Sequence, residues 1–232
     1  MPLALDHRRI GDIAVVTCAG RLVEGAESSA LAQLLDELLP FGPYVVLHLG
    51  ALEFIDSAGV GLLVRYSTRM RHVHGRMTLC APSSKLVAVL KATRLDRVFE
   101  SYETEGEAIA AFYERAATAD APSRLSRTEV LCVLESPDVQ AYVREIVGRN
   151  GYGVLTASNL PDALVLLQAT GPKVVVLSAG FAQVCGTNAA EKFRRRVDGL
   201  SVIELPVDFS QRDSGGAAQW LLDRLRTFIP RS

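Results

Sequence analysis

The segment from Phe54 to Gly61 places the hydroxyl of Ser57 beside the carboxylate of Asp56, where a strand-like pattern becomes a helical one. A serine or aspartate before an apolar helix ordinarily caps it, because its side-chain oxygen accepts a hydrogen bond from a free N–H of the first turn. The same place also suits a phosphate, which would lie at the positive end of the helix dipole near unsatisfied amides. The residues alone leave both interpretations open, a helix cap and a phosphorylation site.

A phosphate on Ser57 would change the charge of this edge strongly. It would add about 1.5 to 2 negative charges at neutral pH, beside Asp56 and Glu53. A partner that covers the edge would have to remove water from that charge next to two carboxylates. We therefore expect phosphorylation to act at an interface, through repulsion and desolvation, more than by refolding the domain.

Apolar strands alternate with amphipathic helices along the whole chain, which predicts an α/β protein. In the first part we expect strands at 13–18, 44–49, 76–81 and 98–99, with helices at 28–39, from 57, at 83–92 and from about 105. In the second part we expect strands at 129–134, 153–157, 173–178 and 201–205, with helices at 138–149, 160–168, 188–197 and 217–229. Parallel strands joined by right-handed helical crossovers are the natural arrangement for this order.

Between the two parts lies a small, polar stretch interrupted by Pro122, which is typical of a domain linker. We therefore expect a first domain at 1–117, a linker at 118–128 and a second domain at 129–232.

Composition narrows the possible functions. The 232 residues include 25 basic and 26 acidic side chains, so no global positive field favours nucleic acid as a partner. The four cysteines lie far apart without a CxxC pair, and at least three lie in apolar runs, so we expect buried reduced thiols. No apolar run reaches the roughly 18 residues of a membrane span, so we expect a cytoplasmic protein without a membrane partner. We find no catalytic triad, phosphate-binding loop or metal-ligand spacing, and expect neither an enzyme nor a cofactor or metal.

Residues from about 8 to 116 resemble a STAS domain, the fold of anti-sigma factor antagonists. The resemblance rests on Gly20-Arg21-Leu22, Leu47-His48-Leu49 and above all the segment from Phe54 to Gly61. It implies a mixed sheet with helices. It also implies that Ser57 is phosphorylated by a partner serine kinase of the histidine-kinase-like ATPase type, which is also the anti-sigma factor, and is dephosphorylated by a PP2C-type phosphatase.

The resemblance also implies where a partner binds. We expect Asp56, Ser57, Ala58, Gly59 and Glu24 to form the partner-binding site, which holds the partner when Ser57 is unphosphorylated and releases it when Ser57 is phosphorylated. This chain has Val23 where the family commonly has an acid, with Glu24 one position later, and Ala58 where the family has a second small hydroxyl. The alternative is a constitutive scaffold or dimerisation protein without a phosphate switch.

Residues from about 128 to 232 resemble a response-regulator receiver domain, with a doubly wound, flavodoxin-like parallel sheet. That family uses an aspartate at the end of the third strand and an acid pair that holds magnesium, whereas this chain has Ser178 and only Glu135 at those positions. Serine does not replace an aspartyl nucleophile without an activating base. The resemblance therefore implies a degenerate, receiver-like module that takes no phosphate on aspartate and serves docking or homo-oligomer formation.

Overall fold

The computed structural model describes residues 1–41, 44–118, 128–183, 188–209 and 214–230. The chain forms two compact units, Met1–Phe112 and Tyr113–Ser232. The division falls within helix α4 (Glu105–Thr118), and most of the predicted linker lies outside the described residues. The predicted domain limits of 117 and 129 therefore stay a prediction.

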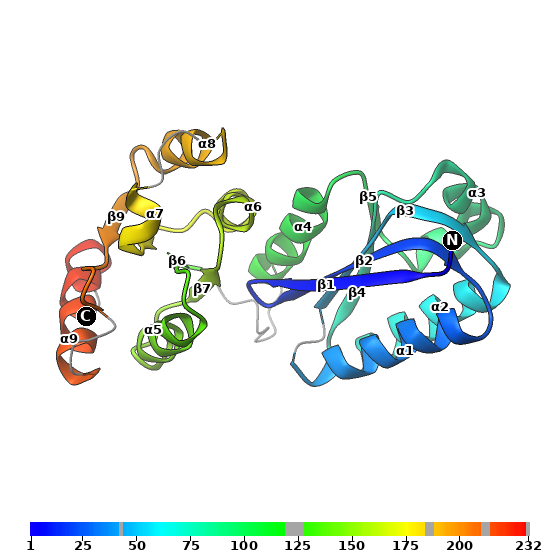
Figure 1. Cartoon of the computed structure of the whole chain (residues 1–232), viewed down its shortest axis with the longest axis horizontal. Coiled ribbons are helices and arrows are strands. Elements are labelled where there is room, and N and C mark those ends of the chain that lie inside the picture. The colour runs from blue at the N-terminus through cyan, green and yellow to red at the C-terminus, as the bar shows by residue number, and fades with distance from the viewer. Residues whose placement is uncertain (42–43, 119–127, 184–187, 210–213, 231–232) are drawn as a thin grey trace. The chain divides into compact units, whose positions relative to one another are not determined.

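The first unit is built on a five-stranded mixed sheet in the order β1-β2-β3-β4-β5 (Figure 1). The strands are β1 (Ala4–Ile10), β2 (Ile13–Leu22), β3 (Tyr44–Ile55), β4 (Arg76–Cys80) and β5 (Ser101–Tyr102). β1 and β2 form an antiparallel hairpin, and the other neighbouring strands run parallel. The predicted mixed α/β sheet of the first half is confirmed.

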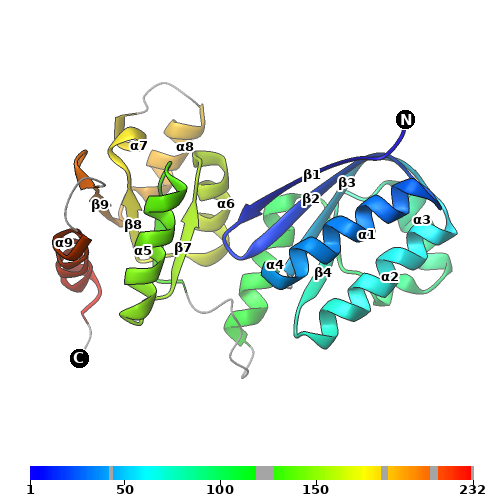
Figure 2. The same ribbon diagram turned by 60° about the horizontal axis from the view of Figure 1, so that its bottom comes forward.

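Helices cover both faces of this sheet. α1 (Ala26–Leu38) and α2 (Ser57–His72) lie side by side on one face, and α4 lies on the other (Figure 2). α3 (Ser84–Ala92) follows β4 and contributes Leu86 and Leu90 to the core on the side of α1 and α2. That core is centred on side chains with no exposed surface, among them Leu35, Leu47 and Leu63. Strand β3 lies between β2 and β4, so the residues at its carboxyl end have a rigid support.

Three predictions for this unit were incomplete or wrong. β1 was missed because its residues from Asp6 to Arg9 are polar and exposed, as suits an edge strand without a buried face. β3 continues six residues beyond the predicted end at Leu49, to Ile55. The strand predicted at 98–99 is wrong, because a 3₁₀ turn at Leu95–Arg97 leads to Phe99, which is buried in the core.

The second unit has a four-stranded parallel sheet in the order β7-β6-β8-β9, with helices on both faces (Figures 1 and 2). Its strands are β6 (Val130–Val133), β7 (Val154–Ala157), β8 (Val174–Leu177) and β9 (Ser201–Glu204). Its helices are α5 (Pro137–Arg149), α6 (Leu160–Thr170), α7 (Ala179–Gln183), α8 (Asn188–Val197) and α9 (Ser214–Phe228). The predicted second parallel sheet is therefore present, and the short helix α7 was not predicted.

A separate core holds the second unit together. Val143 of α5 and Leu221 of α9 pack on the same face of the sheet as Val130 and Val176. α6 and α8 contact each other on the opposite face, where Phe193 is buried. Because the central strands are covered on both faces, they are apolar throughout, which explains why periodicity alone predicted their positions.

Three cysteines are buried and free, as the sequence predicted, and Cys185 lies outside the described residues. Burial raises the pKa of the Cys18 thiol to about 12, of Cys80 to about 11 and of Cys132 to about 12. These side chains therefore stay protonated at neutral pH and behave as small apolar residues.

We predict that the native Cys185→Ser protein reacts very slowly with Ellman's reagent at pH 8, because only a thiolate attacks the reagent and these thiols are both protonated and covered. The absorbance should rise by three thiol equivalents after unfolding in urea. Rapid reaction of any thiol in the native state would contradict the buried positions.

Candidate partner-binding site at the start of helix α2

Asp56 joins three segments at the carboxyl end of β3. Its Oδ1 accepts a hydrogen bond from the amide of Gly59 at 2.8 Å, and its Oδ2 accepts one from the amide of Glu24 at 2.9 Å. Its own amide donates to the carbonyl of Leu22, at the end of β2, at 3.2 Å. We call this set of three bonds the Asp56 clasp, since it fixes the start of α2 to both β2 and the turn that leads into α1.

Ser57 is the first residue of α2 and is exposed, and Asp56 is the residue that caps the helix. Within the described residues, the Ser57 hydroxyl makes no hydrogen bond. The two interpretations of this motif therefore fall on different residues, the cap on Asp56 and the free hydroxyl on Ser57. Asp56, Ser57, Ala58, Gly59 and Glu24, predicted as one site, lie together here.

Two amides at the start of α2, those of Gly59 and Val60, are already engaged, whereas the sequence suggested unsatisfied amides there. Asp56 accepts from Gly59 through its carboxylate and from Val60 through its carbonyl, the latter at 3.0 Å. A phosphate on Ser57 would therefore compete with the Asp56 carboxylate for these donors. It would gain them only by displacing the carboxylate beside which it lies.

Hydrogen bonding lowers the pKa of the Asp56 carboxyl below its ordinary value. The largest cause is the bond from the Gly59 amide, followed by the bond from the Glu24 amide. Asp56 is therefore charged at neutral pH, and both of its oxygens accept bonds. The carboxylate is thus occupied in holding structure and is poorly placed to take a proton from Ser57.

Gly59 is required by close packing, whereas Gly61 is not. A Cβ at Gly59 would lie 2.8 Å from Ile55 Cγ1 and 2.8 Å from the carbonyl oxygen of Leu22. A Cβ at Gly61 would meet nothing within 4 Å. Only the first glycine therefore lets α2 approach the end of β2.

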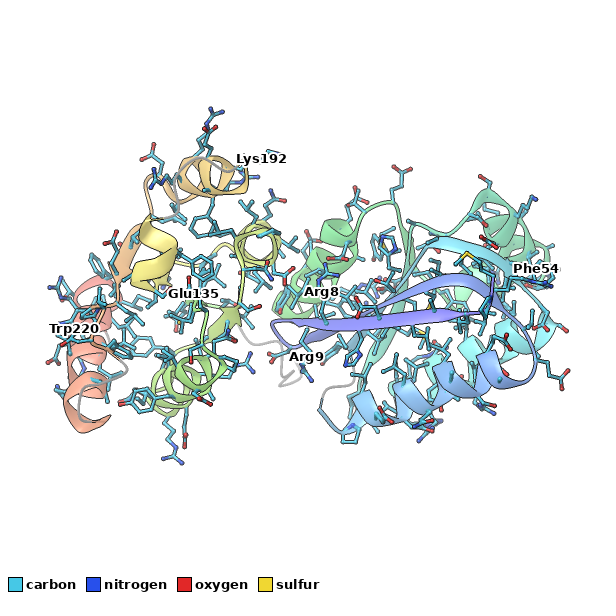
Figure 3. All side chains as sticks on the ribbon, in the orientation of Figure 1. Arg8, Arg9, Phe54, Glu135, Lys192 and Trp220 are labelled. Atoms are coloured by element: carbon cyan, nitrogen blue, oxygen red, sulfur yellow. The ribbon has the colours of Figure 1, made fainter. Side chains whose placement is uncertain are left out.

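The structure adds two residues that the sequence did not predict for this site, Phe54 and Arg21. The pairing of β2 with β3 shifts after Gly20, so that Gly20 lies opposite Leu52 while Arg21 lies opposite Phe54. The Arg21 guanidinium lies over the Phe54 ring, 5.2 Å from its centroid. The Phe54 side chain is 49% exposed, and Figure 3 shows it at the periphery of the unit. The β-bulge that brings the pair together leaves no simple signal in the sequence.

The first two residues of the chain also lie at this end of the sheet. The Met1 amine lies 3.5 Å from Glu53 Oε2. Gly20, with a φ of 93°, allows this approach, because a Cβ there would lie 2.3 Å from the carbonyl oxygen of Pro2. Glu53 therefore has a cationic neighbour, whereas no ion pair of the described residues involves Glu24.

In the second unit, Glu135 and Ser178 follow neighbouring strands β6 and β8 at the same edge of the sheet. The Glu135 carboxylate lies over Gly180, where a Cβ would be 2.4 Å from Oε1 (Figure 3 labels Glu135). The Ser178 hydroxyl is buried and has no hydrogen-bond partner among the described residues. Ser136 instead caps α5 by accepting a bond from the Val139 amide.

Two other kinds of site are missing from the parts of the chain that the structure describes. No helix there is long and apolar enough to cross a membrane. Within the same ranges, no three His, Cys, Asp or Glu side chains gather in a way that could hold a metal ion.

Comparison with known proteins bears directly on the first unit. The family model of the STAS domain matches residues 4–108. The N-terminal unit is a STAS domain. A Thermotoga neapolitana protein described as an anti-sigma factor antagonist homologue is 34% identical over 65 residues, which is 28% of this chain and 58% of that protein. The chain thus spans less than two thirds of the length of this relative.

Solved structures similar to this chain include two bacterial proteins. An anti-sigma factor antagonist from Thermotoga maritima is 26% identical, with a TM-score of 0.44, and the match covers 46% of this chain and 92% of that one. A STAS domain protein from Planctomyces limnophilus is 28% identical, with a TM-score of 0.41, over 48% of this chain and 97% of that one.

We predict that Gly59→Ala lowers the free energy of unfolding of the STAS unit by about 1 to 3 kcal/mol, because the added methyl group overpacks against a backbone carbonyl. Gly61→Ala is the matched control, which should be neutral or stabilise α2 by up to about 1 kcal/mol. Urea unfolding followed by circular dichroism measures both. Equal effects of the two substitutions would contradict the close approach at Gly59.

We also predict that Asp56→Asn lowers stability at pH 7, because an amide accepts through one oxygen only and presents an NH₂ group to the other backbone donor. The pKa of Asp56 is lowered in the folded state, so its contribution is complete above the pKa of about 3.9 that it has in the unfolded chain. That contribution is lost as pH falls through the lower folded value. The difference in unfolding midpoint between wild type and Asp56→Asn should therefore shrink as pH falls from 5 to 3, and a difference independent of pH would refute the clasp.

Proposed function

We propose that the STAS unit is an anti-sigma factor antagonist that is switched by phosphorylation of Ser57. The observation that carries this proposal is the division of roles between two neighbours. Asp56 caps α2, so Ser57 is left exposed with a free hydroxyl and has no evident structural task. The description of the Thermotoga neapolitana relative as an anti-sigma factor antagonist homologue supports the antagonist part of this proposal.

In this proposal the unphosphorylated unit binds an anti-sigma factor through the surface that contains Glu24, Asp56, Ser57, Ala58 and Gly59. Phosphate adds about two negative charges next to Asp56, whose carboxylate already holds the nearby amides. The new charge would therefore have to compete with Asp56 for the Gly59 and Glu24 amides. A partner that covered it would have to bury a dianion beside a carboxylate, so binding is lost by desolvation and repulsion.

The remaining assignments follow from the resemblance to the STAS family. The anti-sigma factor is itself the serine kinase, of the histidine-kinase-like ATPase type, and a PP2C-type phosphatase restores the free hydroxyl. The STAS unit has no catalytic role of its own, since it is the substrate of both partners, and we place the whole system in the cytoplasm.

For the second unit we propose a degenerate receiver-like domain that serves docking or homo-oligomer formation. Its strand order is β7-β6-β8-β9, so the second strand of the unit lies at the edge of the sheet, next to the first. This is the order of a doubly wound sheet. Ser178 occupies the end of the third strand of this unit, and Glu135 is the acid that follows the first. A phosphorylated aspartate is therefore not part of the proposal.

The test is incubation with candidate serine kinases of the histidine-kinase-like ATPase type, ATP and magnesium, followed by intact mass measurement. We expect one added phosphate on wild type and none on Ser57→Ala. Ser84→Ala is the matched control, because Ser84 is also an exposed first residue of a helix, α3, and its loss should leave the added phosphate in place.

A constitutive scaffold predicts the opposite outcome. A stable complex with the kinase-like protein, without modification of Ser57, would overturn the switch and favour that alternative. Treatment of the modified chain with a PP2C-type phosphatase should return the mass to its starting value.

A further inference from the structure

We infer that Phe54 and Arg21 form a preassembled anchor for the anti-sigma factor, and that the partner presents an apolar pocket for the ring with a carboxylate for the guanidinium. This inference rests on the proposed function, because it names the chemistry of the partner of the same site. It assigns a role to two residues that the predicted partner-binding site did not include.

Exposure is the first argument. Phe54 is 49% exposed, whereas Tyr66 of the following helix α2 is buried in the core. An aromatic ring left in water on the rigid end of a central strand gains free energy when a partner covers it. Binding energy at protein interfaces is concentrated in such aromatic and arginine residues.

Arg21 adds a charged hydrogen-bond donor to this anchor. Its guanidinium rests on the Phe54 ring, and no carboxylate or carbonyl among the described residues forms a hydrogen bond or ion pair with it. A guanidinium that stacks through its face keeps the N–H donors on its edge available. Because those donors fit a carboxylate in bidentate geometry, charge complementarity points to an acidic side chain on the partner.

The backbone holds the two side chains in place before any partner binds. The bulge in the pairing of β2 with β3 sets Arg21 opposite Phe54, one residue pair before Leu22 and Ile55 end the ladder. Directly after that ladder, Asp56 binds back to Leu22. A preassembled pair loses little conformational entropy on binding, which favours affinity.

The acid on the partner also explains why phosphate causes release. Phe54 lies three residues before Ser57, on the same strand end that the Asp56 clasp joins to α2. A partner carboxylate drawn to Arg21 would face the new dianion, and like charges brought together at an interface cost several kcal/mol. In this inference the partner's carboxylate therefore serves both functions: it binds Arg21, and it is repelled by a phosphate on Ser57.

The test measures affinity for the ATP-binding kinase-like protein used above, by calorimetry with the full chain and a non-hydrolysable ATP analogue. We expect Phe54→Ala to weaken binding about 30-fold and Arg21→Gln about tenfold. Arg21→Glu should weaken binding further than Arg21→Gln, because it repels the partner's acid. Phe54→Leu, which keeps an apolar side chain, should retain part of the affinity.

Matched controls come from the second unit. Phe228 of α9 is 42% exposed, and the Arg224 guanidinium lies 5.5 Å from the centroid of the Trp220 ring. Phe228→Ala and Arg224→Gln therefore make the same chemical changes elsewhere and should leave affinity unchanged.

The outcomes separate the inference from the proposed function. If wild type binds and phosphorylation of Ser57 releases it, but the Phe54 and Arg21 variants bind as tightly as wild type, the anchor is wrong and the switch stands. If Arg21→Glu and Arg21→Gln lose affinity equally, the acidic partner group is wrong. If wild type does not bind at all, both the proposed function and the proposed anchor are wrong. Should Phe54→Ala fail to fold, Phe54→Leu and the Arg21 variants decide.

Discussion

The bonds made by Asp56 are the constraint on which this site depends. Its carboxylate accepts from the start of α2 and from the turn before α1, while its amide binds the end of β2. Three segments that are separate in the sequence are thereby fixed at the carboxyl end of one strand. Gly59 is needed for the same reason, since a side chain there would push α2 away from Leu22.

The Asp56 clasp determines the hydrogen bonding around the neighbouring Ser57. Because the cap is supplied by Asp56, the hydroxyl of Ser57 is free, and a phosphate on it would have to compete with the Asp56 carboxylate for the Gly59 amide. A helix start usually favours a phosphate. Here an adjacent carboxylate has taken that place, so the same modification becomes a source of repulsion while the fold can stay as it is.

The sequence predicted much of this, and the limits have physical causes. The buried parallel strands of both units and the amphipathic helix Asn188–Val197 were predicted closely, because their burial dictates their residue types. Strand β1 was not predicted, since an edge strand with an exposed polar surface lacks that signal. The motif of Asp56 and Ser57 was recognised from its position, but either residue can cap a helix, and only the geometry separates their roles. Phe54 and Arg21 were missed because their contact depends on a bulge in the pairing of strands that lie far apart in the sequence.

The central claim is that phosphate at Ser57 abolishes partner binding by its charge, without unfolding the STAS unit. The most direct measurement compares two chains, one with serine and one with genetically encoded phosphoserine at position 57, for affinity toward the proposed ATP-binding partner and for unfolding midpoint in urea. Phosphoserine at position 84 serves as the control. The account predicts about a hundredfold weaker binding only for the chain modified at position 57, with little change in its unfolding midpoint. Equal affinity of the two chains would contradict the account, and so would a loss of binding that arises from unfolding.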